Sequence, residues 1–212
     1  MTALMALLGV DLAVPTYSTL SRRQAHLSIA LPLRPAQGPI HLVVDSTGLK
    51  VYGESEWKVR VHGWSTRRTW RKLHMGFNAE TGEVVAQTLT EAKYDDASQA
   101  KPLMEQTPAA QAAPIEAVIP PQKNATTRKA KRRYRHIEAR NQRVEAIEGM
   151  GRKRWEKQVR YHWRSLAETG VARYKRIIGP KLRARALPQQ KSEARLGCSI
   201  FNRMIHLGKP ET

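Results

Sequence analysis

The sequence has little cysteine, few acidic residues and no long hydrophobic run. Its single cysteine, Cys198, excludes an intrachain disulfide and predicts a protein of a reducing compartment. The apolar stretch at residues 3–10 is too short to span a membrane. It also has no basic flank before it and is followed by Asp11, so it is a weak candidate for a signal peptide.

The shortage of acids leaves a large positive charge. The 212 residues include 37 Lys and Arg but 18 Asp and Glu, a net charge of +19. Residues 122–187 hold 21 of the basic and 5 of the acidic residues, a net +16, which leaves +3 for the rest. Such a block predicts a polyanionic partner and favours nucleic acid. A solvated charged tail is the alternative.

The densest basic run predicts phosphate binding that is salt-dependent and independent of DNA sequence. In the free protein the same residues are compatible with a solvated loop. The run comprises Arg128, Lys129, Lys131, Arg132, Arg133 and Arg135.

Hydrophobic patterns predict the strands. The apolar run Ile40–Val44 is typical of a strand buried on both faces, and Lys50–Tyr52 could continue it. Leu73–Asn78 and Glu83–Thr90 predict two further strands, joined by a hairpin turn at Thr81-Gly82. A fourth short strand is predicted at Ile115–Ile119, before two prolines.

Three helices are predicted in the later part of the chain. Asp95 and Asp96 provide an N-cap and a first-turn acid for a helix at 97–106. A helix at Arg160–Ile178 ends before Gly179-Pro180, and a last helix at 193–207 carries Leu196, Ile200, Met204 and Leu207. Cys198 on that helix is expected in the core. Strands followed by helices in this order predict an α/β sheet of ribonuclease-H-like type.

A charged motif lies on the helix predicted at 160–178. Tyr161, Arg164, Glu168 and Lys175 fall within an arc of about 60° if each residue turns the helix by roughly 100°. An acid among cations is poorly suited to a core, but it is well suited to hold a metal ion beside phosphates. A surface ion-pair cluster is the alternative interpretation.

Asp45, at the end of the first apolar run, is the second candidate acid. A carboxylate there is costly to bury unpaired, so it needs a metal ion, a cation or solvent. Alternatively it stabilises the turn that its neighbours Ser46, Thr47 and Gly48 would form. Asp45 and Glu168 together would provide hard oxygen ligands for Mg²⁺ or Mn²⁺.

Long stretches resemble bacterial insertion-sequence transposases with an Asp-Asp-Glu triad, of the insertion-sequence five type. The signature Y-x2-R-x3-E-x6-K is formed by the four residues of the charged motif. The similar stretches cover most of the chain, at 10–23, 41–106, 116–125, 161–185 and 202–210.

The resemblance implies a ribonuclease-H-like catalytic fold, strand cleavage and strand transfer on double-stranded DNA, and recognition of terminal inverted repeats. It implies that Asp45 and Glu168 are catalytic and bind Mg²⁺ or Mn²⁺, while Tyr161, Arg164 and Lys175 contact DNA. It also implies a bacterial cytoplasmic, nucleoid-associated protein that can form a homodimer on DNA, with no membrane partner.

One departure from the family bears on catalysis. In the family, a strand with the second catalytic aspartate lies between the helix at 97–106 and the strand at 115–119. Here only Thr107–Pro114 joins them, which is too short for a strand and a helix. Glu116 is a remote substitute. The sheet could close if the strand at 115–119 paired directly with that at 40–44.

The sequence therefore predicts an N-terminal helical remnant and linker at 1–39, and a ribonuclease-H-like domain at 40–212 with a basic insertion at about 122–158. That domain lacks one strand–helix unit and has a basic helical C-terminal part. We expect DNA binding with weak or absent catalysis. The alternatives are a non-catalytic DNA-binding regulator derived from a transposase, and a small RNA-binding protein of ribosomal kind.

Three tryptophans interleaved with arginines complete the candidates. Trp57, Trp64 and Trp70 could stack on nucleic-acid bases or pack on the sheet. The histidines at 62, 74, 136 and 162 have no zinc spacing with Cys198.

Overall fold

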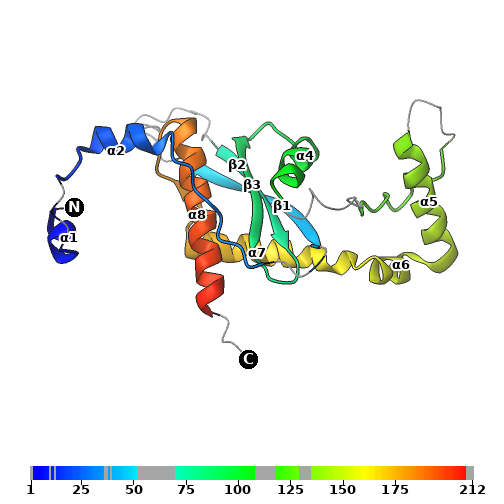
Figure 1. The fold of residues 1–212 in the computed structure, drawn as a ribbon. Helices are drawn as coiled ribbons and strands as arrows, with labels where there is room; N and C mark the ends of the chain where they lie inside the picture. The colour runs from blue at the N-terminus through cyan, green and yellow to red at the C-terminus, as the bar shows by residue number, and fades with distance from the viewer. Residues whose placement is uncertain are drawn as a thin grey trace, which may run out of the picture.

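The fold is a mixed sheet with helices on both faces, seen in a computed structural model (Figure 1). The structure describes residues 2–9, 11, 13–35, 38, 40–51, 70–107, 118–128 and 135–208. Three strands form its centre: β1 (Leu42–Val51), β2 (Trp70–Asn78) and β3 (Val84–Glu91). A fourth, β4 (Lys181–Leu182), completes the order β3-β2-β1-β4.

The strands pair as the sequence patterns require. β2 is antiparallel to both β1 and β3, with Asp45 opposite Met75 and Leu73 opposite Leu89. The predicted hairpin is confirmed, because Asn78 N–H donates to Glu83 O at 2.9 Å and the turn lies between them. β4 runs parallel to the far end of β1, beside Lys50 and Val51.

The two faces of the sheet carry different helices. α4 (Asp96–Gln106) lies on one face, while α7 (Arg164–Ile177) and α8 (Leu187–Gly208) lie on the other. The side chains that fill the space between sheet and helices α7 and α8 are almost wholly buried. They include Leu49, Leu73, Met75, Phe77, Leu89, Ala167, Tyr174, Cys198 and Phe201.

α8 also closes the outer edge of β3. The Asn202 side chain accepts from Val84 N–H at 2.8 Å and donates to Val84 O at 2.9 Å. At Val84, a side-chain amide thus provides the hydrogen bonds that a further strand would have made, and it covers this end of the strand's edge.

The remaining helices lie at the two ends of the molecule. α1 (Thr2–Leu7) and α2 (Tyr17–Gln24) lie on the side of α8, while α5 (Arg135–Met150) and α6 (Arg152–Gln158) extend away on the other side (Figure 1). A 3₁₀ turn, η2 (Tyr161–Trp163), joins α6 to α7. Among the described residues, no helix combines the length and the apolar character needed to cross a membrane.

The structure corrects several sequence predictions. β1 starts at Leu42 and runs unbroken to Val51, so the possible continuation through Lys50 is confirmed and residues 46–48 form no turn. It is half-buried along most of its length, whereas burial on both faces was predicted. Val118 and Ile119, the described end of the strand predicted at 115–119, are exposed and lie in no strand. The rest of that segment lies outside the described residues, as do Glu116, Trp57 and Trp64.

The ends of the last helices also differ from prediction. α7 begins at Arg164, four residues later than predicted, because Arg160 adopts a left-handed φ of 54° and Tyr161 lies in the 3₁₀ turn. α8 begins at Leu187, six residues earlier than predicted. Cys198 is buried, as predicted, and burial raises the pKa of its thiol to about 12.

Candidate functional site

Asp45 lies in the middle of β1, on the face that α7 and α8 cover. Side chains alternate along a strand, so Asp45 shares its face with Val43, Thr47 and Leu49. Its cross-strand neighbour Met75 is completely buried, whereas Asp45 itself is half-buried. Its Oδ1 accepts a hydrogen bond from Ser46 N–H at 2.8 Å. The carboxylate is therefore at the margin of the core, as an ion ligand must be.

α7 reaches the same face by a close approach at Gly170. A Cβ added to Gly170 would lie 2.6 Å from Cε1 of Phe77, closer than any real contact. Ala167 and Tyr174 flank this glycine on the buried side of α7. The missing side chain lets the helix lie directly on β2. It also fixes the position of Glu168, two residues before Gly170.

Arg164 interacts electrostatically with both candidate carboxylates. Its Nη2 lies 4.0 Å from Glu168 Oε1, and its Nη1 donates to the Tyr161 hydroxyl at 3.2 Å. The hydrogen bond to Tyr161 raises the pKa of Arg164, and the negative charges of Glu168 and Asp45 raise it further. Asp45, from β1, and Glu168, from α7, thus act on one guanidinium group.

Lys175 is the last member of the charged motif. It lies seven residues after Glu168 on the same helix, about 10 Å along the axis at 1.5 Å per residue. Glu168 and Arg164 are mostly exposed, with side chains 62 % and 59 % accessible, and Lys175 is half-buried. The motif is therefore a surface that a large ligand can reach.

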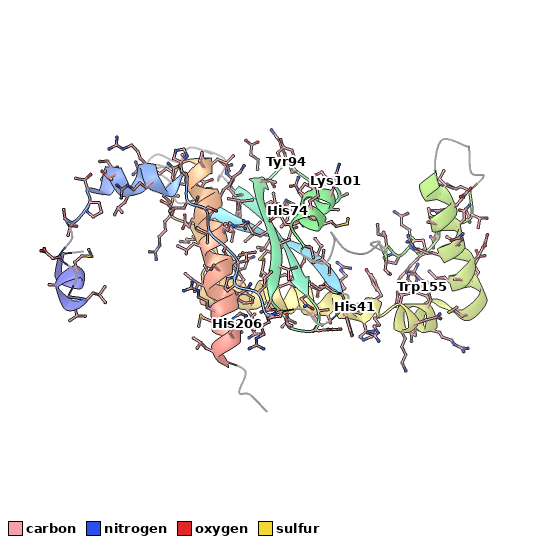
Figure 2. All side chains as sticks on the ribbon, viewed as in Figure 1. His41, His74, Tyr94, Lys101, Trp155 and His206 are labelled. Atoms are coloured by element: carbon pink, nitrogen blue, oxygen red, sulfur yellow. The ribbon has the colours of Figure 1, made fainter. Side chains whose placement is uncertain are left out.

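An aromatic cluster that the sequence patterns did not indicate holds the start of α7. Trp163 packs edge-on against His41, with ring centroids 4.8 Å apart, and Arg160 lies over the Trp163 ring at 4.9 Å. His41 immediately precedes β1 and also contacts Glu80, 3.5 Å from Nδ1 (Figure 2). The cluster joins the start of β1 to the start of α7: His41 lies four residues before Asp45, and Trp163 lies five residues before Glu168.

The acids at the start of α4 lie on the opposite face of the sheet. Asp95 caps the helix by accepting from Ser98 N–H at 3.0 Å, as predicted. Asp96 contacts Lys72 Nζ at 2.9 Å and His74 Nδ1 at 3.0 Å. These partners alternate with Leu73 and Met75, so they face away from Asp45.

The same cluster pairs the Asp96 carboxylate with Lys72, while the buried His74 Nδ1 lies close to Asp96 without making a hydrogen bond to it. Burial opposes ionisation of Asp96, but hydrogen bonds with Lys72 and Ser46 outweigh it and lower the pKa of this carboxyl. Burial lowers the pKa of His74, which is fully enclosed between the sheet and α4 (Figure 2). His74 Nε2 lies 2.9 Å from the Thr90 hydroxyl. These contacts assign Asp96 a structural role in docking α4.

The described part of the basic block forms an exposed extension. The Asn141 side chain holds the backbone of Arg128 on both sides, accepting from its N–H at 3.0 Å and donating to its O at 2.6 Å. The Arg128 side chain itself is exposed. The other predicted DNA contacts of this run, Lys129, Lys131, Arg132 and Arg133, lie outside the described residues.

Residues 36–178 match a family model described as a transposase DDE domain, and residues 1–54 match a second model with the same description. The first match covers well over half of the chain. The chain belongs to the DDE-type insertion-sequence transposases. No solved structure matches it.

DDE transposase domains use divalent metal ions. The residues of this transposase can therefore be checked for a site that would hold such an ion. Among the residues that the structure describes, no group of three or more His, Cys, Asp or Glu side chains is arranged so that it could hold a metal ion. The donor chemistry of Asp45 and Glu168 suits a hard cation, which carboxylates and water would bind. Among the described residues, the guanidinium group of Arg164 pairs with Glu168 and is within electrostatic range of Asp45.

Trp70, the described member of the tryptophan set, packs on the sheet of the transposase. Its ring lies 3.1 Å from the point where a Gly48 side chain would begin, and Lys50 Nζ lies 5.6 Å from its centroid. Trp70 is 37 % exposed, so one part of the ring supports the sheet and another part remains accessible.

Proposed function

We propose that this transposase binds double-stranded DNA through its basic extension and α7, and that its strand cleavage is weak or absent. A single observation carries the second half of the proposal. The aspartates nearest in sequence to the missing second one, Asp95 and Asp96, are used to cap and dock α4 on the opposite face of the sheet from Asp45.

The architecture supports a ribonuclease-H-like core of the insertion-sequence five type. Three antiparallel strands precede a helix, and the first of them carries a central carboxylate on the face of the later helix α7. The proposed division is an N-terminal helical remnant and linker at 1–39 followed by the transposase domain at 40–212. Residues 24–34 contact α8, so the two parts are packed together.

Asp45 and Glu168 are the proposed catalytic carboxylates and the ligands for Mg²⁺ or Mn²⁺. When bound, such an ion would supply Lewis-acid activation of the attacking oxygen and charge stabilisation of the leaving oxygen. A third carboxylate on that face would normally share this task. Without it, the residues of this chain still provide charge and position through Arg164 and Tyr161.

The proposed DNA contacts follow the exposed cations. Tyr161, Arg164 and Lys175 would contact phosphates next to the carboxylates, while Arg128, Lys129, Lys131, Arg132 and Arg133 would bind the flanking duplex. Phosphate contacts of this kind provide affinity and register, with a strong dependence on salt. Terminal inverted repeats, a homodimer on DNA and a nucleoid location of the protein in the bacterial cytoplasm belong to the same proposal.

Binding and cleavage should be measured on the same labelled duplex, carrying the terminal inverted repeat of the element. We expect salt-dependent binding and, with Mg²⁺ or Mn²⁺, cleavage close to the background of the Asp45→Ala variant. Robust cleavage that disappears in Asp45→Ala but persists in Asp96→Asn would overturn the catalytic part. Absence of DNA binding by the folded protein would overturn the rest.

A non-catalytic regulator that occupies the ends of the element is the second candidate. The observation that favours it is Arg164, a permanent cation that pairs with Glu168 and is within electrostatic range of Asp45, and so offsets negative charge without a metal ion. A regulator requires binding but no acid, so Glu168→Ala should leave its biological effect unchanged.

A further inference from the structure

α8 has two apolar sides, and the structure covers one of them. Ala194, Cys198, Phe201 and Ile205 are at most 3 % exposed and face the sheet. The other apolar side chains are spaced four, four and three residues apart, so they form one stripe along the helix. This α8 stripe consists of Leu196, Ile200, Met204 and Leu207, which are 47 %, 42 %, 46 % and 87 % exposed.

The N-terminal part of the chain already uses α8 as a docking surface. Gln24 Nε2 donates to Gln189 O at 3.4 Å, and Gln189 Nε2 donates to Ser21 O at 3.2 Å. Further along, Arg195 donates to Ile29 O and Asn202 Nδ2 donates to Pro32 O at 3.1 Å. In Figure 1 the N-terminal segment follows α8 over much of its length.

Other contacts occupy the rest of the helix surface. Gly197 lies against α7, where an added Cβ would be 2.6 Å from the Tyr174 hydroxyl. The sheet lies against the buried side, and residues 29–34 lie along a third side. The α8 stripe is thus an apolar surface next to an interface that the chain has already formed.

The helix α1 is an apolar segment that ends at leucines exposed to solvent. Residues 1–10 contain no charged side chain, and Leu7 and Leu8 are 84 % and 63 % exposed. A helix that is apolar on all sides is normally buried. A helix of six residues is also too short to be stable by itself in water. α1 therefore requires a surface to pack on.

The connection between α1 and α2 is long enough to reach the α8 stripe. Eight residues, 9–16, separate Leu7 and Leu8 from the start of α2, and they can span up to about 26 Å. α2 contacts Gln189 through Ser21, which lies four residues and about 6 Å after the start of α2, and Ile200 lies eleven residues further along α8, about 17 Å away. The end of the connection is thus at most about 23 Å from Ile200. An intrachain contact between α1 and Ile200 is therefore within reach.

We propose that α1, which in Figure 1 lies beyond α2 and apart from α8, folds back and docks on the α8 stripe of its own chain, with Leu7 and Leu8 against Leu196, Ile200 and Met204. The inference does not depend on the proposed function. A second copy fits less well, because a stable interface buries roughly 800 Å² per partner and four partly exposed side chains provide much less. The net charge of +19 also opposes association of two copies. A tethered helix needs less area, since its effective concentration is of millimolar order.

The first test is chemical cross-linking of the full chain. A variant with Leu8→Cys and Ile200→Cys is treated with a short bismaleimide, and the products are separated by size and mapped by mass spectrometry. Cys198 is 0 % exposed and stays unmodified. The control pairs Leu8→Cys with Lys101→Cys, which is on α4 at the other face of the sheet (Figure 2).

We expect an intrachain cross-link in the first variant at several times the yield of the control. Products that join two chains only would overturn the proposal in favour of a second copy. A yield equal to that of the control would overturn it too.

Hydrogen exchange provides an independent test without new cysteines. Ile200→Glu places a charge in the α8 stripe and should reduce the protection of the amides of residues 2–9 about tenfold. Ile177→Glu alters a similarly exposed isoleucine on α7, 38 % accessible, and should leave those amides unchanged. Equal protection in the Ile200→Glu variant and the wild type would contradict the docking.

Discussion

Each face of the sheet carries an acid with a basic partner, but the contacts of the two acids differ in length. On the α4 face, Asp96 has short contacts to Lys72 and to the enclosed His74, at 2.9 and 3.0 Å. On the α7 face, Glu168 is 62 % exposed and its ion pair with Arg164 measures 4.0 Å. The first arrangement is satisfied by the fold itself. Asp96 is also 52 % exposed, so the length of the contacts and not exposure separates the two acids. The longer contact of Glu168 leaves its charge available to a cation and that of Arg164 to a phosphate.

The comparison shows why residue type alone does not define a catalytic acid. Asp96 and Asp45 are both aspartates beside the central strands, yet strand alternation puts their partners on opposite sides. A carboxylate on the α4 face cannot join a metal site formed by Asp45 and Glu168. The four predictions below test this difference between the faces.

The largest effect is expected from Gly170→Ala on the α7 face. The new Cβ would lie 2.6 Å from the buried Phe77 ring, so either α7 or that ring must shift. Overpacking of this kind costs about 1–3 kcal/mol and should lower the Tm by several degrees. The matched control is Gly149→Ala in α5, where nothing lies within 4 Å of the new Cβ. Thermal unfolding checks both, and equal Tm values would contradict the close approach.

On the α4 face, stability should fall as the medium becomes acidic. Burial lowers the pKa of His74 from its ordinary 6.5, so the unfolded chain binds its proton more readily than the folded chain. The free energy of unfolding should therefore decrease as the pH falls below about 6.5 toward the lowered pKa of His74. Denaturant unfolding at several pH values measures this slope. His74→Gln should flatten it, and a slope unchanged in that variant would rule out His74 as its source.

A smaller effect concerns DNA affinity. Glu168→Gln removes a negative charge from the proposed DNA surface, so binding in the absence of divalent ions should tighten about two- to fivefold. Asp96→Asn removes the same charge from the other face and should leave the affinity unchanged. Fluorescence anisotropy with one labelled duplex compares the two. Weaker binding by Glu168→Gln would show that this face does not approach the phosphates.

The smallest effect is expected from the basic extension. Arg128→Ala removes one exposed cation, which should weaken binding about twofold and reduce the salt slope by about one. The loss should be similar for unrelated duplex sequences, because phosphate contacts carry no sequence information. An effect limited to inverted-repeat DNA would instead assign Arg128 to base recognition.

Local patterns predicted those parts of the fold that local physics determines. The β2–β3 hairpin follows from alternation and the Thr81-Gly82 turn, and α4 follows from its Asp95 cap. The start of α7 did not follow, because it depends on the packing of Trp163 against His41, which are 122 positions apart. β4 was missed as well, since a strand of two residues has no periodicity to detect.

In the candidate site, too, local spacing predicted some contacts and tertiary packing determined the others. The spacing of Tyr161, Arg164, Glu168 and Lys175 placed them on one surface, and the structure pairs Arg164 with Tyr161 and Glu168. That Asp45 also acts on Arg164 depends on how α7 lies on the sheet, which Gly170 permits. The sequence alone does not predict which side chain a single glycine in a helix will contact.

Calorimetric titration with Mn²⁺ decides whether Asp45 and Glu168 still form a cation site, using the wild type, Asp45→Ala and Asp96→Asn. We expect weak binding by the folded wild type and by Asp96→Asn, and none by Asp45→Ala. Binding that is lost in Asp96→Asn but retained in Asp45→Ala would contradict this expectation, because the cation site would then lie on the α4 face. No binding by the folded wild type would contradict the claim that Asp45 and Glu168 still form a metal site.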